Sequence, residues 1–162
     1  MKGLNSIIKP VIKELQEEGY NIVEHYADRN EKWRTPDEMP QYYSEIDVCI
    51  CASMHEGTPR PVLESMSCGV PVISTDVGIV RNAFGKKQKE FIIGSRENGR
   101  NDSVVKEELK KKLKEVYGNR SILKELSQEN LESIIQYDGG KIIKDFEKYF
   151  EMCLREWSSL GN

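Results

Sequence analysis

Residues that carry several common kinds of chemistry are scarce in this chain of 162 residues. It has two histidines and four cysteines, and they form no Cys-x-x-Cys or paired His/Cys spacing. No metal site is therefore expected, and the cysteines are interpreted as reduced thiols that pack as small hydrophobic residues. The sequence also has no Ser–His–Asp or Cys–His arrangement, GxGxxG fingerprint or Walker loop, which argues against the enzyme classes that carry those motifs.

Long hydrophobic runs and an excess of one charge are also missing. No apolar stretch approaches the roughly 20 residues of a membrane span, and the N-terminal MKGLNS lacks the hydrophobic core of a signal peptide, so we expect a cytoplasmic protein. The 24 basic and 27 acidic residues are interleaved, which gives no basic surface for nucleic acid. Within the lysine-rich segment 106–114, Glu107 and Glu108 lie four residues before Lys111 and Lys112, so the segment is interpreted as a solvated helix face.

The chain alternates segments with helical and strand patterns. Helices are predicted at 4–17, 37–44, 59–68, 103–117, 120–135 and 139–157, a short helix or turn at 77–84, and strands at 20–26, 46–52, 70–74 and 90–93. The segment 46–52 is almost continuously apolar, as expected of a parallel strand that is covered on both faces. We therefore predict one α/β domain over 1–162, with a helical C-terminal tail from about residue 102.

The segment HEGTPRPVLESMSCGVPVIST, residues 55–75, places two glutamates around the start of a short helix. Thr58 is the predicted N-cap and Pro59 the first helical residue, and Gly69 ends the helix before the next strand. Ligands of open parallel sheets bind beyond the carboxyl ends of the strands, where this loop is expected to lie. Because a helix start offers unpaired N–H groups and the positive end of the dipole, we expect a phosphate there.

Glu56 precedes this helix, and Glu64 lies about 8–9 Å further along its axis. As isolated residues they would be interpreted as part of a capping loop and a solvated side chain. Their separation suits one elongated ligand, such as a nucleoside diphosphate sugar, because carboxylates accept hydrogen bonds from sugar diols. A glycoside hydrolase is disfavoured, since its two carboxylates must flank the scissile bond from opposite sides.

The same region carries a longer pattern. Its members are Ser53, Glu56-Gly57-Thr58-Pro59, Val62-Leu63-Glu64-Ser65-Met66, Gly69, Pro71-Val72-Ile73 and Thr75-Asp76-Val77-Gly78. This pattern resembles the donor-site motif in the C-terminal domain of GT-B glycosyltransferases of family 4, the group 1 transferases. Upstream, Glu38–Tyr43 and Asp47-Val48 resemble the helix and strand that lead into that motif.

The resemblance implies one half of a GT-B fold, with a Rossmann-like parallel sheet and flanking helices. It also implies transfer of a sugar from a nucleoside diphosphate sugar, with retention and without a metal or other cofactor. The expected donor-binding residues are Lys2, Glu56, Gly57, Thr58, Arg60 and Glu64, and Glu56 is also the expected catalytic residue. In this scheme Lys2 contacts the diphosphate, although an ordinary N-terminal lysine is an equally good interpretation. The alternative function is a non-catalytic module that binds a nucleotide sugar or a phosphate.

Several parts of the family pattern are missing. The N-terminal acceptor domain and the first strand of the sheet are absent from the sequence, so the missing domain is an expected partner and the chain alone is expected to be inactive. An unpaired sheet edge predicts self-association, and any membrane contact is expected through the missing half. Arg81-Asn82 replaces a Pro-Glu pair, which puts one donor contact in doubt. His55 is left open as a ligand contact, and packing in a loop is favoured for Trp33 and Arg34 over stacking on a base.

Overall fold

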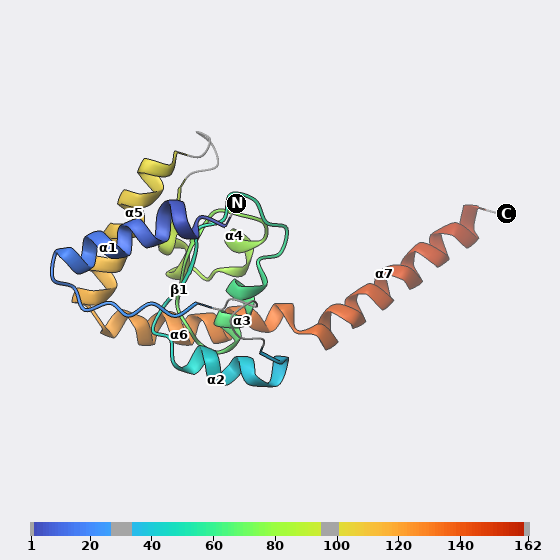
Figure 1. Cartoon of the computed structure of the whole chain (residues 1–162). Helices are drawn as coiled ribbons and strands as arrows, with labels where there is room; N and C mark the ends of the chain where they lie inside the picture. Colours follow the sequence, from blue (N-terminus) through green and yellow to red (C-terminus); the bar gives the residue numbers. More distant parts are fainter. Residues whose placement is uncertain (1, 27–33, 95–100, 161–162) are drawn as a thin grey trace.

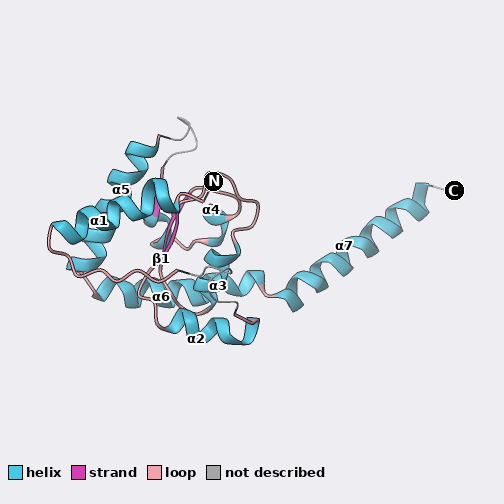
Figure 2. Cartoon of the chain, viewed as in Figure 1, coloured by secondary structure: helices cyan, strands magenta, loops and turns pink. Residues whose placement is uncertain are grey.

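A computed structural model describes residues 2–26, 34–94 and 101–160 of the chain. Its centre is a parallel sheet of three short strands in the order β1 (Cys49–Cys51), β2 (Val72–Thr75) and β3 (Ile92–Ile93). Helices surround this sheet (Figure 1 and Figure 2). The predicted α/β fold, with a parallel sheet and flanking helices, is confirmed.

The predicted helices are present, with ends that differ by a few residues. In chain order they are a π-helical turn (Leu4–Ile8) that continues into α1 (Lys9–Glu17), a 3₁₀ turn (Pro36–Glu38) that continues into α2 (Met39–Ser44), α3 (Arg60–Ser67), α4 (Val80–Ala83), a 3₁₀ turn (Gln88–Phe91), α5 (Asp102–Gly118), α6 (Ser121–Ile134) with a 3₁₀ turn (Ile135–Tyr137), and α7 (Gly139–Leu160). Local chemistry explains two of the ends. Gly19 follows α1 with a φ of 92°, and the Asn101 side chain caps α5 by accepting from the amide of Ser103 at 3.0 Å.

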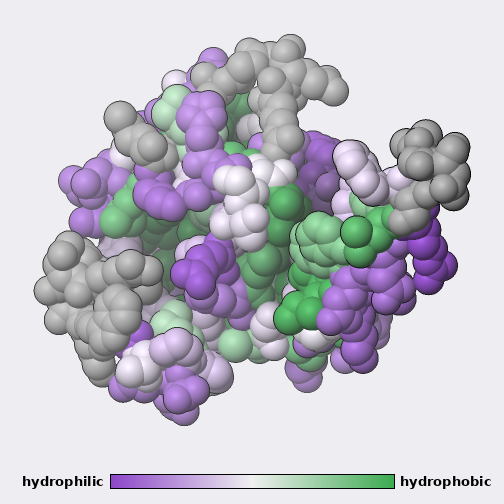
Figure 3. Space-filling model, turned by 90° about the vertical axis from the view of Figure 1, so that its right-hand side faces the viewer, coloured by the Kyte–Doolittle hydropathy of each residue, from purple (hydrophilic) through white to green (hydrophobic). Residues whose placement is uncertain are grey.

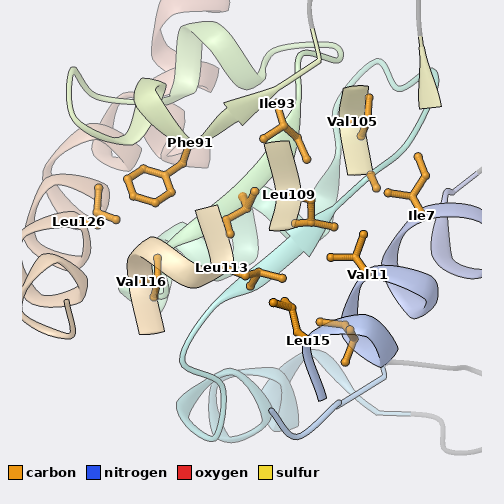
Figure 4. Packing of buried hydrophobic residues seen from close by; sticks show 13 residues of the cluster. Ile7, Val11, Leu15, Phe91, Ile93, Val105, Leu109, Leu113, Val116 and Leu126 are labelled. Atoms are coloured by element: carbon orange, nitrogen blue, oxygen red, sulfur yellow. The ribbon is translucent and has the colours of Figure 1, made fainter. Parts of the chain in front are cut away.

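The two faces of the sheet are covered by different helices. Because side chains alternate along a strand, Ile73 of β2 faces the cluster formed with α1 and α5, while its neighbour Val72 faces the cluster around α3 and α4. In the first cluster the side chains of α1 and α5 point toward one another (Figure 4). Lys110 of α5 also pairs with Glu14 of α1 and with Glu18, directly after α1, at 2.9 and 2.8 Å. Lys112 pairs with Glu115 at 2.9 Å and Lys114 with Glu18 at 2.6 Å. Three lysines of α5 therefore form ion pairs with carboxylates.

A buried polar network attaches α6 to the sheet. The side-chain amide of Asn130 donates to the carbonyl oxygen of Val70 at 3.1 Å and to Oε1 of Gln88 at 2.9 Å. Gln88 in turn donates to the carbonyl oxygen of Val72. Asn130 and Gln88 are both fully buried. The turn before β3 is therefore held against β2 by side chains as well as by strand pairing.

The predicted strand at 20–26 is wrong. These residues pair with no described strand, and the carbonyl oxygen of Ile22 instead accepts from Nε2 of Gln16 at 2.8 Å. Tyr20 and Ile22 pack against the first core cluster, which accounts for the alternating pattern. A cavity lies between this segment and β1, so no neighbouring strand is within reach to complete a ladder. The other strands are shorter than predicted, and residues 90–91 belong to a 3₁₀ turn.

α7 projects from the body of the molecule (Figure 1). Large hydrophobic side chains along it are exposed, namely Ile143, Phe146, Tyr149, Phe150, Met152, Leu154 and Trp157. In Figure 3, hydrophobic and hydrophilic residues lie on opposite flanks of this projecting part. Within the described ranges, no helix has an apolar stretch long enough to cross a bilayer.

Candidate functional site

The loop that follows β1 is held against the end of β2 and the turn after it by hydrogen bonds and close backbone packing. Thr75, the last residue of β2, donates from its hydroxyl to the carbonyl oxygen of Ser53 at 2.7 Å. The amide of Ile79 donates to the carbonyl oxygen of Gly57 at 3.2 Å. Gly78 has a φ of 53°, and a Cβ at this position would lie 1.9 Å from that same oxygen of Gly57. These contacts fix the loop at the carboxyl edge of the sheet, where a ligand of an open parallel sheet binds.

The N-terminal residues reach the same edge. Gly3 has a φ of 72°, and a Cβ there would lie 2.2 Å from the carbonyl oxygen of Ala52, directly after β1. This close approach brings the ammonium of Lys2 onto the carboxylate of Glu56, and the two form an ion pair. The Glu56 side chain is only 16% exposed, and the hydrogen bond from Lys2 lowers the pKa of its carboxyl. Lys2 and Glu56, two predicted site residues that are 54 residues apart in the sequence, are therefore in contact.

The start of α3 differs by one residue from the prediction. Pro59, not Thr58, is the N-cap of α3, and no side chain of the N-cap residue caps the helix. The reason is that the carbonyl of Pro59 accepts the first helical hydrogen bond, from the amide of Val62 at 3.0 Å. Gly57, Thr58 and Arg60 are exposed at this end of the helix, and each carries a backbone N–H that can donate to an anion.

Glu64 lies in the second turn of α3 and faces α2. Its Oε2 accepts a 3.0 Å hydrogen bond from the hydroxyl of Tyr43, whose side chain is buried. Burial, and then the Glu64 carboxylate, raise the pKa of Tyr43, so this phenol stays protonated and donates. Sequence reasoning assigned no role to Tyr43. The available signal was that a buried tyrosine hydroxyl needs a partner.

Four further residues discussed from the sequence are Arg81, Arg34, Trp33 and His55. Asp76 is buried and accepts hydrogen bonds from the guanidinium of Arg81 at 2.6 and 2.9 Å. Where the family has a Pro-Glu pair, this chain therefore has an arginine that is bound to a carboxylate. Arg34 packs over the ring of Tyr42 at 4.4 Å, in line with loop packing, and Trp33 lies outside the described residues. His55 is exposed beside Glu56. The described part of the chain contains no group of three potential metal ligands.

The arrangement groups one ammonium, one carboxylate and the backbone amides of exposed residues around the end of β1, with Glu64 further along α3. Ammonium and amide donors suit phosphate oxygens, and carboxylates suit sugar hydroxyls. Lys2, Glu56, Gly57, Thr58 and Arg60 lie around the amino end of α3. Glu64 is separated from them by one turn of helix and is oriented by Tyr43.

Comparison with known proteins adds a family assignment. The family model for glycosyl transferases group 1 matches residues 12–119, about two thirds of the chain. The chain belongs to this family. The match covers the described loop after β1, α3 and the turn after β2, which form the greater part of the candidate site.

Individual relatives of this group 1 glycosyltransferase chain are longer proteins. The chain is 40% identical over 55 residues to TuaC of Bacillus subtilis (strain 168), a candidate teichuronic acid biosynthesis glycosyltransferase. This match covers 34% of the chain and 14% of TuaC. Sucrose-phosphate synthase from Thermosynechococcus elongatus has a similar fold, with a TM-score of 0.58 and 17% identity over 71% of this chain and 27% of the synthase. The C-terminal domain of the group 1 protein LpcC from Francisella tularensis gives a TM-score of 0.48 and 20% identity, over 79% and 60% of the two chains. The matched parts of the chain therefore cover about a seventh of TuaC and about a quarter of the synthase.

Proposed function

We propose that this chain is the C-terminal, donor-binding domain of a GT-B glycosyltransferase of family 4. It binds a nucleoside diphosphate sugar at the carboxyl edge of the sheet. The observation that carries this proposal is that the ion pair of Lys2 and Glu56 lies next to the exposed residues 57, 58 and 60 at the start of α3. Family membership supports sugar transfer, and the chemistry of these groups supports a donor with both phosphates and hydroxyls.

The ion pair between Lys2 and Glu56 gives each residue a role in donor binding. The Lys2 side chain is 75% exposed, so its ammonium is accessible to a diphosphate. A diphosphate that takes the Lys2 ammonium and the amides at the start of α3 releases the Glu56 carboxylate, which then accepts from the sugar hydroxyls. Glu56 acts as the catalytic residue by holding the sugar for transfer with retention. The reaction uses no metal, because the ammonium and the helix start stabilise the departing diphosphate.

Glu64 binds the ribose of the donor. Its Oε2 accepts from Tyr43, and a carboxylate can accept at both oxygens, so Oε1 takes the ribose hydroxyls. The hydrogen bond from Tyr43 holds the carboxylate in one orientation before the nucleotide arrives, which reduces the entropy lost on binding.

The acceptor is held by a second set of residues on the opposite side of the donor, which we call the second wall. All of the proposed donor groups come from one edge of one sheet, whereas transfer needs an acceptor hydroxyl within about 3–3.5 Å of the anomeric carbon. We place that wall in an N-terminal GT-B domain that acts as the partner of this chain. By itself the chain binds the donor and at most hydrolyses it slowly. The alternative is a module that binds nucleotide sugars or phosphate and takes no part in transfer.

Donor binding is tested by titrating the chain calorimetrically with UDP-glucose, GDP-mannose and ADP-glucose, with and without EDTA. We expect one of the three to bind, with an affinity that EDTA does not change. Glu64→Ala should weaken it by about 1.5–3 kcal/mol, the value of a charge-assisted hydrogen bond. Glu107→Ala, on the exposed side of α5, is the matched control and should bind like the parent chain. A folded Glu64→Ala chain with unchanged affinity would contradict the ribose assignment.

Transfer is tested with a radiolabelled donor and candidate acceptors, using the chain alone and the chain together with an N-terminal GT-B domain. We expect transfer only in the second case. Glu56→Ala in the assembled enzyme should then lower turnover more than donor affinity. Rapid transfer by the chain alone would refute the need for a second wall, and donor binding without transfer in either case would favour the non-catalytic module.

A further inference from the structure

The cavity beside β1 borders the proposed donor site at one end. Its volume is about 530 Å³, within the range of roughly 300–1,000 Å³ that small-molecule sites have. Its lining includes Leu4 and Pro61, each within two residues of a proposed diphosphate-binding residue. It also includes Tyr43, whose hydroxyl donates to Glu64. The part of a donor that lies beyond the diphosphate and the ribose can therefore enter this cavity.

The segment after α1 runs along the cavity toward the donor site. At its start, the ring of Tyr20 packs edge-on against Tyr117, near the end of α5, with 4.9 Å between the ring centres. At its end, the ammonium of Lys9 lies 5.4 Å from the centre of the Tyr26 ring. Lys9 begins α1, and the helical turn before it starts at Gly3, against the end of β1. The last residues of the segment are therefore nearer to the donor site than the first.

Polar groups also line the cavity. Apart from the tyrosines, these side chains are Asn21, Glu24, His25, Glu45, Asp47 and Arg120. Glu45 and Asp47 precede β1 and so lie at the end away from the donor site, where Asp47 pairs with Arg120 at 2.7 Å. Glu24 lies in the second half of the segment after α1 and is the carboxylate placed toward the donor site.

Tyr26 orients the Glu24 side chain. Its hydroxyl donates a hydrogen bond to Oε2 of Glu24. Burial, and then this hydrogen bond, raise the pKa of Tyr26, so the phenol stays protonated and remains a donor. A carboxylate can accept at both oxygens, so Glu24 keeps the capacity to accept from a ligand in the cavity.

The base of a nucleotide fits this position. The base is attached to the ribose carbon next to the 2′-hydroxyl, so a ribose bound by Glu64 places the base beside Tyr43, in the cavity. The flat faces of a base can pack on the aromatic and apolar part of the lining, which includes Ile8 and Tyr42. The edge of the base is then read by polar groups.

A carboxylate distinguishes the bases by their edges. Guanine presents two adjacent donors, N1–H and the N2 amino group, which match the two oxygens of one carboxylate. Uracil, adenine and cytosine each present an acceptor beside their donor, and the lone pair of that acceptor would face the second carboxylate oxygen. Such a contact disfavours these three bases.

We propose that the donor is a guanosine diphosphate sugar and that Glu24 binds its guanine through N1–H and the N2 amino group. Glu24 is then the residue that determines the specificity for the base, and Tyr26 is its positioning residue. This inference rests on the proposed donor site, and it names the nucleotide that the site takes.

The probes are GDP, IDP, UDP and ADP, each titrated calorimetrically into the full chain. IDP lacks only the N2 amino group of GDP, so the ratio of the two affinities isolates one of the two bonds. We expect GDP to bind at least about tenfold more tightly than each of the others, as for the loss of a hydrogen bond to a charged group. Glu24→Gln should reduce the ratio of GDP to IDP affinity to less than about threefold, because the amide has one acceptor oxygen. Asp47→Asn, at the far end of the cavity, and His25→Ala are the controls and should keep the ratio of the parent chain.

A second measurement needs no variant. The NMR resonance of the Glu24 carboxyl carbon should move when GDP saturates the parent chain. An unmoved resonance, a GDP preference that survives Glu24→Gln, or its loss in either control would overturn the role of Glu24. Equal affinity for the four nucleotides, or tightest binding of UDP or ADP, would overturn the choice of guanine and leave the donor site in place. Binding of none of them would contradict the proposed function itself, and this inference with it.

Discussion

The hydroxyl of Tyr43 donates a 3.0 Å hydrogen bond to Oε2 of Glu64 and so links α2 to the second turn of α3. If Glu64 binds ribose, Tyr43 is its positioning residue. Tyr43→Phe removes the bond and keeps the ring, so we expect nucleotide affinity to fall by about 0.5–1.5 kcal/mol, less than for Glu64→Ala. Calorimetric titration of the preferred donor checks this order. Tyr42→Phe is the matched control, and an equal loss of affinity in both variants would show a packing effect instead.

Gly78 and Gly57 form the tightest backbone contact at the site. Gly78→Ala would place a Cβ 1.9 Å from the carbonyl oxygen of Gly57, at a φ of 53°. The left-handed conformation alone costs about 1–2 kcal/mol, and the clash must push the two loops apart. We therefore expect a lower free energy of unfolding and weaker donor binding, measured by urea denaturation and calorimetry. Gly118→Ala, at a position with open space around its Cβ, should change neither.

The parts of this site that depend on local chemistry were predictable from the sequence. A strand, a loop with Glu56 and Gly57, and a short helix between prolines and Gly69 follow from the spacing of apolar residues and helix-ending residues. The prediction that this strand is covered on both faces is wrong, because the residues of β1 are only partly buried. The exact cap did not follow, because Thr58 and Pro59 are both compatible with that position and only the hydrogen bonds decide between them. Lys2 required the family resemblance, since 54 residues separate it from Glu56.

Pairings between distant elements were not predictable. Tyr43 and Glu64 are on different helices, and no local pattern relates them. The segment 20–26 has a strand pattern because Tyr20 and Ile22 pack against the core, but a strand also requires a neighbour, and local sequence does not show whether one is present. Among the described residues, no strand pairs with the edge of β1 that faces away from β2.

The ion pair between Lys2 and Glu56 predicts a pH dependence. Lys2 lowers the pKa of the Glu56 carboxyl, so its stabilising contribution is fully present above the unfolded value of about 4.3 and is lost as pH falls through the lower folded value. Lys2→Ala should raise the Glu56 pKa toward its ordinary value, as measured by NMR titration of the carboxyl carbon. Lys13→Ala, whose partner Glu17 is exposed, should leave Glu56 unchanged. An unshifted Glu56 in the Lys2 variant would argue against the pair.

Among the polar residues of the core, Asn130 is predicted to lower the free energy of unfolding most when it is replaced. Asn130→Ala removes the side-chain donor to the carbonyl oxygen of Val70 and one of the donors to Oε1 of Gln88. Asn130 and Gln88 are both fully buried. Each buried group left unsatisfied costs about 1–3 kcal/mol, so we expect the free energy of unfolding to fall by about 2–4 kcal/mol. Urea denaturation measures it. Gln128→Ala, exposed on the same helix, should cost less than about 0.5 kcal/mol.

α7 is predicted to drive self-association without contributing to the fold. Its side chains Phe146, Phe150 and Trp157 are 56%, 61% and 79% exposed, so they lend little stability to the body of the molecule. Exposed aromatic residues in a row form a contiguous apolar patch, which favours contact with another copy. We expect sedimentation velocity to show mass that rises with concentration for the full chain and a monomer for a chain that ends at Asp138.

The melting temperature separates this role of α7 from a structural one. The chain that ends at Asp138 should melt within about 2 °C of the full chain, because a loss of 1 kcal/mol would already lower the midpoint by roughly 2–8 °C in a domain of this size. A point variant makes the same test without truncation. Phe150→Lys places a charge in the middle of the exposed stripe and should weaken association, whereas Lys148→Ala, beside it on the polar flank, should not. Association of equal strength in all of these chains would exclude α7 as the contact and would leave the open edge of β1 as the surface to examine.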